Sequence, residues 1–99
     1  MSPRVQIDAN RISDFCRRWN VTELALFGSV LRNDFREDSD VDVLISLSPD
    51  AHVGLFDLAR MERDLTEILG HKVDLVTKGG LKAGIRDSVL SSAEVLYAA

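Results

Sequence analysis

This 99-residue sequence has only one cysteine, no long apolar run and no surplus of positive charge, and each of these features excludes a class of protein. The single cysteine, Cys16, cannot form an internal disulfide, which agrees with a reducing compartment and gives no support for redox chemistry. No apolar stretch approaches the roughly 20 residues that span a bilayer. Residues 1–8 also lack the apolar segment of a signal peptide. We therefore expect a cytoplasmic protein without a membrane segment.

Basic residues are outnumbered by acidic ones, 12 to 16, and the formal net charge is −4. Because sequence-independent binding to a phosphate backbone depends mainly on Lys and Arg, stable nucleic-acid binding is not expected. The composition is 45% hydrophobic and 28% charged, which is ordinary for a folded protein. A chain of this length can build one hydrophobic core, so we expect a single domain over residues 1–99. A large substrate must then be held partly by another molecule.

Hydrophobic periodicity predicts two main helices. The first covers about residues 8–19, with apolar positions Ile12, Phe15, Cys16 and Trp19. The second covers about residues 55–69, with apolar positions Leu58, Met61, Leu65 and Ile68. Charged residues such as Glu62 fill the remaining turns of the second helix, and Gly70 provides its C-terminal stop. Two brief helices are predicted further on, over residues 81–89 and 93–97.

Short apolar runs predict three strands, over residues 23–27, 40–47 and 72–77. The second run becomes continuously apolar and rich in β-branched residues, which is typical of a partly buried strand. Strands that alternate with helices indicate a small α/β domain with a short mixed β-sheet packed with helices. This pattern does not determine the strand order.

Three aspartates on these strands form the candidate catalytic and metal-binding group. Asp40 and Asp42 are separated by one residue, so their carboxylates are expected on one face of the strand, about 6.6 Å apart at the backbone. Asp74 lies in an otherwise apolar run, where an unpaired carboxylate would be costly to bury. Paired aspartates supply the hard oxygen ligands that two-metal sites prefer, and a shared metal would remove the cost of burying Asp74.

Gly28 and Ser29 form a candidate phosphate-binding turn at the end of the first predicted strand. Gly28 permits close backbone approach, and Ser29 is expected to N-cap a helical turn whose free N–H groups can receive an anion. Because Mg²⁺ usually binds through a few carboxylates plus substrate phosphates, the same site would hold a triphosphate. The predicted chemistry is phosphoryl transfer.

Gly28-Ser29, ten intervening residues and then Asp40-x-Asp42 resemble the signature of the nucleotidyltransferase superfamily, which has a DNA polymerase beta-like fold. Arg32 lies inside the spacer and Ser39 directly before the first aspartate. With the third acidic strand at Asp74 and the short chain, the sequence resembles the minimal nucleotidyltransferases (MNT), the antitoxin halves of HEPN–MNT toxin–antitoxin pairs. The resemblance is strongest over residues 24–77.

This resemblance implies a function and a role for each site residue. Asp40 and Asp42 would bind two Mg²⁺ ions, and Asp74 would complete the site of the catalytic ion. Gly28 and Ser29 would bind the β,γ-phosphates of ATP. The family members transfer AMP from ATP to a tyrosine hydroxyl of the HEPN ribonuclease toxin, release pyrophosphate and neutralise the toxin. A hetero-oligomer with that toxin is implied. Asn33 departs from the Gly that many relatives have after the Arg, a change that αL-tolerant Asn should accommodate.

Two other functions remain open from the sequence. A non-catalytic antitoxin would keep the fold and inhibit its partner by binding alone. A nucleotidyltransferase that acts on a small molecule, as larger relatives do, is the other, although 99 residues leave little chain for a dedicated acceptor pocket. Arg32 is equally explained as a nucleotide ligand or as a brace to Asp34 or Asp38. Lys82 and Arg86 fit a basic surface stripe better than triphosphate ligands.

Overall fold

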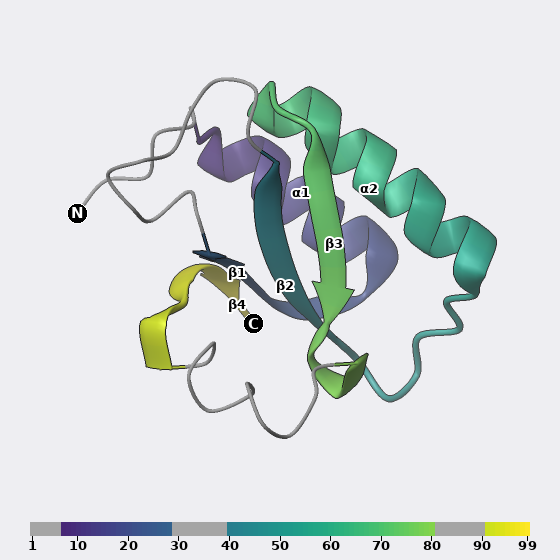
Figure 1. The fold of residues 1–99 in the computed structure, drawn as a ribbon. Coiled ribbons are helices and arrows are strands. Elements are labelled where there is room, and N and C mark those ends of the chain that lie inside the picture. Colours follow the sequence, from purple (N-terminus) through teal and green to yellow (C-terminus); the bar gives the residue numbers. More distant parts are fainter. Residues whose placement is uncertain (1–6, 29–39, 81–90) are drawn as a thin grey trace.

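The structure is a computed structural model that describes residues 7–28, 40–80 and 91–99. The described elements follow one another in this order: α1 (Ala9–Trp19), β1 (Val21–Phe27), β2 (Val41–Leu47), α2 (Leu55–Leu69), β3 (Val73–Thr77), the 3-10 turn η2 (Lys78–Gly80) and β4 (Glu94–Ala98). Figure 1 shows the strands as one twisted sheet with the helices beside it. The predicted brief helix over residues 81–89 and the predicted turn at Ser29 lie outside the described residues.

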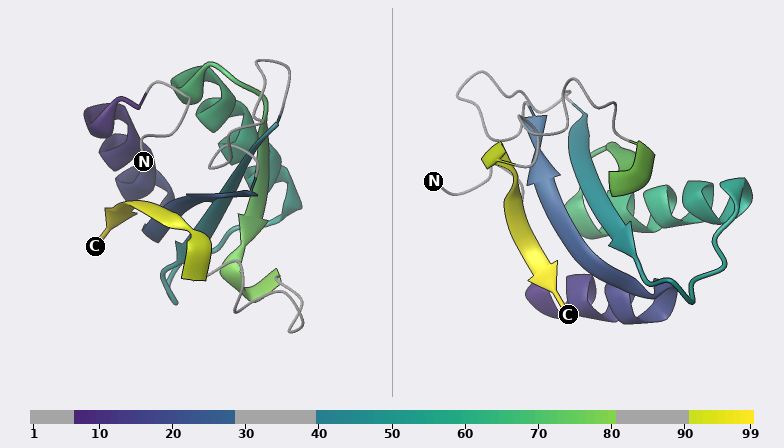
Figure 2. Two further views of the ribbon diagram at one scale, coloured as in Figure 1. Left: turned by 60° about the vertical axis from the view of Figure 1, so that its left-hand side comes forward. Right: turned by 90° about the horizontal axis from the view of Figure 1, so that it is seen from below.

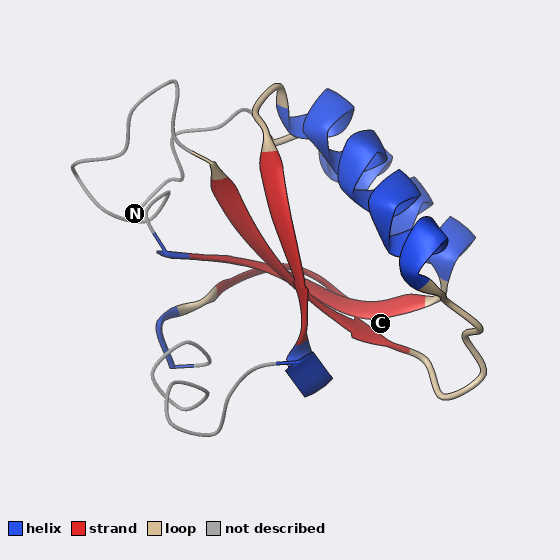
Figure 3. Cartoon of the chain, turned by 45° about the vertical axis from the view of Figure 1, so that its right-hand side comes forward, coloured by secondary structure: helices blue, strands red, loops and turns tan. Residues whose placement is uncertain are grey.

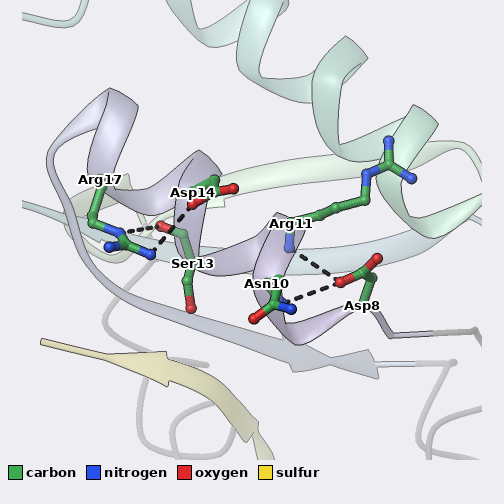
Figure 4. A network of polar contacts seen from close by, with 6 residues as sticks. All are labelled: Asp8, Asn10, Arg11, Ser13, Asp14 and Arg17. Atoms are coloured by element: carbon green, nitrogen blue, oxygen red, sulfur yellow. Dashed lines mark hydrogen bonds and ion pairs between the residues drawn. The ribbon is translucent and has the colours of Figure 1, made fainter.

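The helix α1 begins and ends at residues suited to those positions. The Asp8 carboxylate accepts hydrogen bonds from the backbone N–H groups of Asn10 (3.1 Å) and Arg11 (3.2 Å), as Figure 4 shows. The helix ends at Asn20, which takes the left-handed conformation at φ 57°. On the exposed side, Arg17 bonds the Asp14 carboxylate at 3.3 Å, a contact of little energetic weight in water. The helix predicted over residues 8–19 is confirmed.

The helix α2 matches the predicted range of 55–69 at both ends. Its first turn is closed by Asp57, whose Oδ2 accepts a hydrogen bond from the Gly54 backbone N–H at 3.1 Å. Its C-terminus is closed by Gly70, which has φ +72° and whose N–H donates to the Thr66 carbonyl. The strong hydrophobic period and the glycine stop both act locally, so the sequence alone could place this helix.

The sheet is mixed and has the strand order β3-β2-β1-β4. The central strands β1 and β2 are antiparallel, β4 is antiparallel to β1, and β3 is parallel to β2. The α/β class and the mixed sheet predicted from the sequence are thereby confirmed. The strands start one or two residues away from the predicted positions: β1 begins at Val21 rather than Glu23, β2 at Val41 rather than Asp40, and β3 at Val73 rather than Lys72.

The hydrophobic core lies between the sheet and the two helices, which cover the same face of the sheet (Figure 2 and Figure 3). Its strand residues include Leu24, Leu26, Val43 and Ile45, and its helix residues include Ile12, Cys16, Met61 and Leu65. Burying one such large aliphatic side chain contributes about 1.5–3 kcal/mol. Because the strands and both helices share this core, it holds the ends of the strands in fixed positions relative to one another. Among the described residues no helix is long and apolar enough to cross a bilayer.

The prediction of a brief helix over residues 93–97 is wrong, because this segment forms the strand β4, Glu94–Ala98. A run of this length cannot distinguish helix from strand by its period. The decisive factor is β1, which has β2 on one edge and needs partners for its backbone groups on the other. β4 supplies them, pairing Tyr97 with Leu24 and Glu94 with Leu26.

Cys16 is fully buried, and burial raises the pKa of its thiol to about 12. At about pH 8 the thiolate fraction should therefore be roughly a thousandfold smaller than that of a thiol of ordinary pKa. We expect iodoacetamide to label Cys16 slowly in the folded protein and rapidly in denaturant, which mass spectrometry over time would measure. Equal labelling rates in the two states would contradict this burial.

Candidate active site

Asp42 occupies the centre of the candidate site because β2 lies between two other strands. It pairs across the sheet with Phe27, near the end of β1, and with Asp74, near the start of β3. Directly paired residues of neighbouring strands place their side chains on the same face of a sheet. The parallel register therefore puts the Asp42 and Asp74 side chains next to each other, where the β2 and β3 strands begin together in Figure 1.

The two carboxylates lie on the sheet face opposite α1 and α2. Val41 and Val43, the neighbours of Asp42, are fully buried in the core, so alternation directs Asp42 to the opposite face. Val73, beside Asp74, is buried in the same core. Asp42 is half-buried and Asp74 is exposed.

Because Asp74 is exposed, the cost that the sequence indicated for burying its carboxylate does not arise. β3 is an edge strand, and its Asp74 position faces away from the helices. The adjacent apolar residues Val73 and Leu75 pack in or against the core on the helix side of the sheet.

Gly28 lies directly against Asp42, which is possible because Gly28 has no side chain. A Cβ atom built on Gly28 would collide with the Asp42 carboxylate oxygen and would lie 3.1 Å from its Cγ. The residue also has φ +76°, a left-handed conformation that favours glycine. The end of β1 therefore lets the Asp42 carboxylate approach the backbone closely, at the position predicted for phosphate binding.

Gly28→Ala is expected to lower nucleotide transfer by at least about tenfold, because the Asp42 carboxylate must move to admit the methyl group. Gly70→Ala is a matched control. Gly70 has a similar φ of +72°, yet a built Cβ meets no atom within 4 Å. Both variants should lose stability from backbone strain in a melting experiment, and only Gly28→Ala must in addition displace Asp42. Equal transfer rates for the two variants would contradict close packing of Gly28 against Asp42.

Of the other predicted site residues, the structure describes Asp40 only. Asp40 is exposed and directly precedes β2, two residues from Asp42, so strand alternation directs both to the same face. Ser29 and Arg32 lie outside the described residues. Within the described ranges no three His, Cys, Asp or Glu side chains are grouped closely enough to hold a metal ion. The backbone thus brings the three aspartates to one end of the sheet without closing their carboxylates into a three-ligand group.

The oxygen atoms of these aspartates are still suitable ligands for Mg²⁺. Asp42 and Asp74 offer carboxylate oxygens side by side, and Mg²⁺ is usually held by one or two carboxylates together with substrate phosphates. Gly28, with no side chain, lets the Asp42 carboxylate lie against the backbone at the end of β1.

A cavity of about 260 Å³ lies elsewhere, between α1 and α2, and is lined by charged and apolar residues that include Arg11, Arg18, Asp64 and Glu67. None of the predicted site residues lines it. The candidate site is therefore the end of the sheet and not this inter-helix cavity.

A model of the nucleotidyltransferase domain family matches residues 10–96, which include all the predicted site residues. The chain belongs to the nucleotidyltransferase family. Within that family, the chain is similar to the protein adenylyltransferase MntA of Thermococcus cleftensis. The two are 41% identical over 80 residues, which cover 81% of this chain and 77% of MntA. The predicted membership of the minimal nucleotidyltransferases, and the prediction of an enzyme, are confirmed.

Solved structures agree with this nucleotidyltransferase assignment. One, described provisionally as a minimal nucleotidyltransferase, has 37% sequence identity and a TM-score of 0.69, covering 86% of this chain and 87% of that one. Another is the complex of a tri-AMPylated Shewanella oneidensis HEPN toxin with its MNT antitoxin. A chain of that complex has a TM-score of 0.65 over 92% of this chain and 70% of its own length. At 18% identity, this second likeness is one of fold alone.

Glu62 and Thr66 of α2 lie near the site, but the sequence pattern predicts only a charged surface position for Glu62 and no role for Thr66. Both accept hydrogen bonds from backbone N–H groups of β3 on either side of Asp74. Their spacing of four residues places them on one face of α2. That spacing alone could not indicate which strand they would meet.

Proposed function

We propose that this nucleotidyltransferase transfers AMP from ATP to a tyrosine hydroxyl of a partner HEPN-domain ribonuclease, releases pyrophosphate and so neutralises a toxin. The observation that carries the proposal is the pairing of Asp42 with Asp74 beside the close approach of Gly28, in a chain similar to a protein adenylyltransferase. The catalytic residues are Asp40, Asp42 and Asp74, and the nucleotide is bound through Gly28, Ser29 and Arg32.

The same three aspartates are the proposed ligands of two Mg²⁺ ions. When bound, Mg²⁺ neutralises the charge on the phosphates and on the attacking oxygen. Asp42 is central because it lies between Gly28, where the phosphates approach, and Asp74. Asp74 is exposed at the edge strand, so it is open to an acceptor group that arrives from another molecule.

The proposed reaction joins the tyrosine oxygen to the α-phosphorus of ATP. The bond from the α-phosphorus to the bridging oxygen of the β-phosphate breaks, and pyrophosphate leaves with its electron pair. A tyrosine hydroxyl has an ordinary pKa near 10, so its proton must be removed as the new bond forms. Asp74 is the candidate acceptor of that proton or the residue that positions the acceptor oxygen.

The proposal of a protein acceptor has two supports. MntA, which shares 41% identity over most of both chains, is named as a protein adenylyltransferase. The fold is also that of an MNT antitoxin in complex with an AMPylated HEPN toxin. Neither of these two likenesses points to a small-molecule acceptor.

The test separates catalysis from inhibition by binding alone. A HEPN-domain ribonuclease, sought first among the genes adjacent to the gene of this chain, is incubated with the chain, Mg²⁺ and ATP. The chain is then removed, and ribonuclease activity is measured. Covalent AMP transfer predicts that activity stays low after removal, and that peptide mass spectrometry finds AMP on a tyrosine. Omitting ATP is the control. If ribonuclease activity is lost without ATP and returns when the chain is removed, inhibition by binding alone explains the result and covalent transfer does not.

A further inference from the structure

The helix α2 is bonded directly to the outer edge of β3. The Thr66 Oγ1 accepts a hydrogen bond from the Val73 backbone N–H at 3.1 Å, and the Glu62 Oε2 accepts one from the Leu75 backbone N–H, also at 3.1 Å. The Thr66 hydroxyl in turn donates to the Glu62 carbonyl at 2.8 Å. Two side chains of one helix thus occupy donors of an edge strand that would otherwise face away from the sheet.

These two bonds lie on either side of Asp74. Along a strand, backbone N–H groups point alternately to the two neighbouring edges, so the Val73 and Leu75 donors point away from β2. The residue between them, Asp74, pairs with Asp42 on the β2 side. The backbone around Asp74 is therefore held from both edges, by β2 on one side and by α2 on the other.

Burial makes the two contacts effective. Both Glu62 and Thr66 are half-buried, and each directly follows a core residue of the same helix, Met61 and Leu65 respectively. A charged acceptor on a backbone N–H in a partly buried site is stronger than a neutral one. The Glu62 bond attaches to the peptide group directly after Asp74, so it constrains the residue that the proposed site depends on.

We propose that Glu62 and Thr66 are positioning residues that hold Asp74 against Asp42 in the geometry needed for metal binding and transfer. This inference rests on the proposed role of Asp74. Glu62 is not proposed to contact substrate or metal. It acts by holding the backbone of β3 next to Asp74. Loss of the Leu75 bond would leave β3 attached to β2 but free to shift at Asp74.

The test compares three variants of α2. Glu62→Met keeps length and helix propensity but removes the acceptor, while Glu62→Gln keeps an acceptor oxygen. Glu67→Met is the matched control, since Glu67 is exposed on the same helix and bonds no β3 group. Amide hydrogen exchange at Leu75 should accelerate in Glu62→Met and stay near wild type in Glu62→Gln and Glu67→Met.

The second readout is Mn²⁺ binding in the presence of a non-hydrolysable ATP analogue, followed by electron paramagnetic resonance. Glu62→Met should bind Mn²⁺ about tenfold more weakly, as expected when a residue supporting a metal ligand is lost. In an Asp74→Asn background, Glu62→Met should have no further effect, because two residues that act as a unit are not additive.

The outcomes separate this proposal from the function it rests on. Weaker Mn²⁺ binding in Glu62→Met, rescued in Glu62→Gln and absent in the Asp74→Asn background, supports positioning. Wild-type Mn²⁺ affinity in Glu62→Met overturns positioning while leaving the metal site intact. Equal weakening with and without Asp74 assigns Glu62 a general structural role and also overturns it. If the wild-type protein binds no Mn²⁺ in the presence of the analogue, the proposed metal site is wrong, and so is the positioning role of Glu62 and Thr66.

Discussion

Asp42→Asn is expected to lower AMP transfer by about 10³-fold or more while the protein still unfolds cooperatively at a similar temperature. The loss is expected because Asp42 lies between Gly28 and Asp74, with its carboxylate directly against Gly28. Removing a single group that stabilises developing charge typically costs about 10²–10³ in rate, and loss of a shared metal ligand should cost more.

The fold should tolerate Asp42→Asn because Asp42 lies on the face away from the helices and its neighbours Val41 and Val43 supply the core contacts. The measurement is the rate of AMP incorporation into the partner, with thermal melts of both proteins. Asp50→Asn is the control, an exposed carboxylate in the turn after β2. Wild-type transfer by Asp42→Asn would remove Asp42 from the site.

Asp74→Asn is expected to separate nucleotide binding from turnover. Transfer should fall by about 10²-fold or more, since in-line displacement relies on the positioning and charge stabilisation that Asp74 would supply. Binding of a non-hydrolysable ATP analogue should weaken only modestly, because Gly28 and Asp42, on the other side of the site, are unchanged. Calorimetric titration and single-turnover transfer rates measure the two quantities.

A parallel loss of analogue binding and transfer in Asp74→Asn would contradict this division of roles. It would make Asp74 a nucleotide ligand in the ground state. The exposed position of Asp74 makes the comparison clean, because the substitution buries no new polar group and leaves no cavity.

The sequence could predict those parts of the fold whose signals are local. α2 was placed at both ends because its period and its Gly70 stop are properties of neighbouring residues. β4 was mistaken for a helix because its identity depends on the open edge of β1, about seventy residues earlier in the chain. Strand order is likewise a property of long-range pairing.

The sequence could name candidate site residues, but it could not predict their surroundings. The two-residue spacing of Asp40 and Asp42 indicated a shared face, which the sheet supports. The register that pairs Asp42 with Asp74 could not be read from spacing, since it is set by how β3 docks on β2 and α2. The exposure of Asp74 follows from the same docking, because only a strand order shows which strand lies at an edge.

The central claim is that the α-phosphate of ATP moves, with its nucleoside, to the partner protein. Parallel reactions with wild-type protein, Mg²⁺ and the proposed HEPN-domain partner would contain ATP labelled at either the α- or the γ-phosphate. The account predicts that only the α label stays on the partner, on a tyrosine, and that the γ label appears in pyrophosphate. Transfer of the γ label to the partner, or neutralisation of the partner without either label, would contradict it.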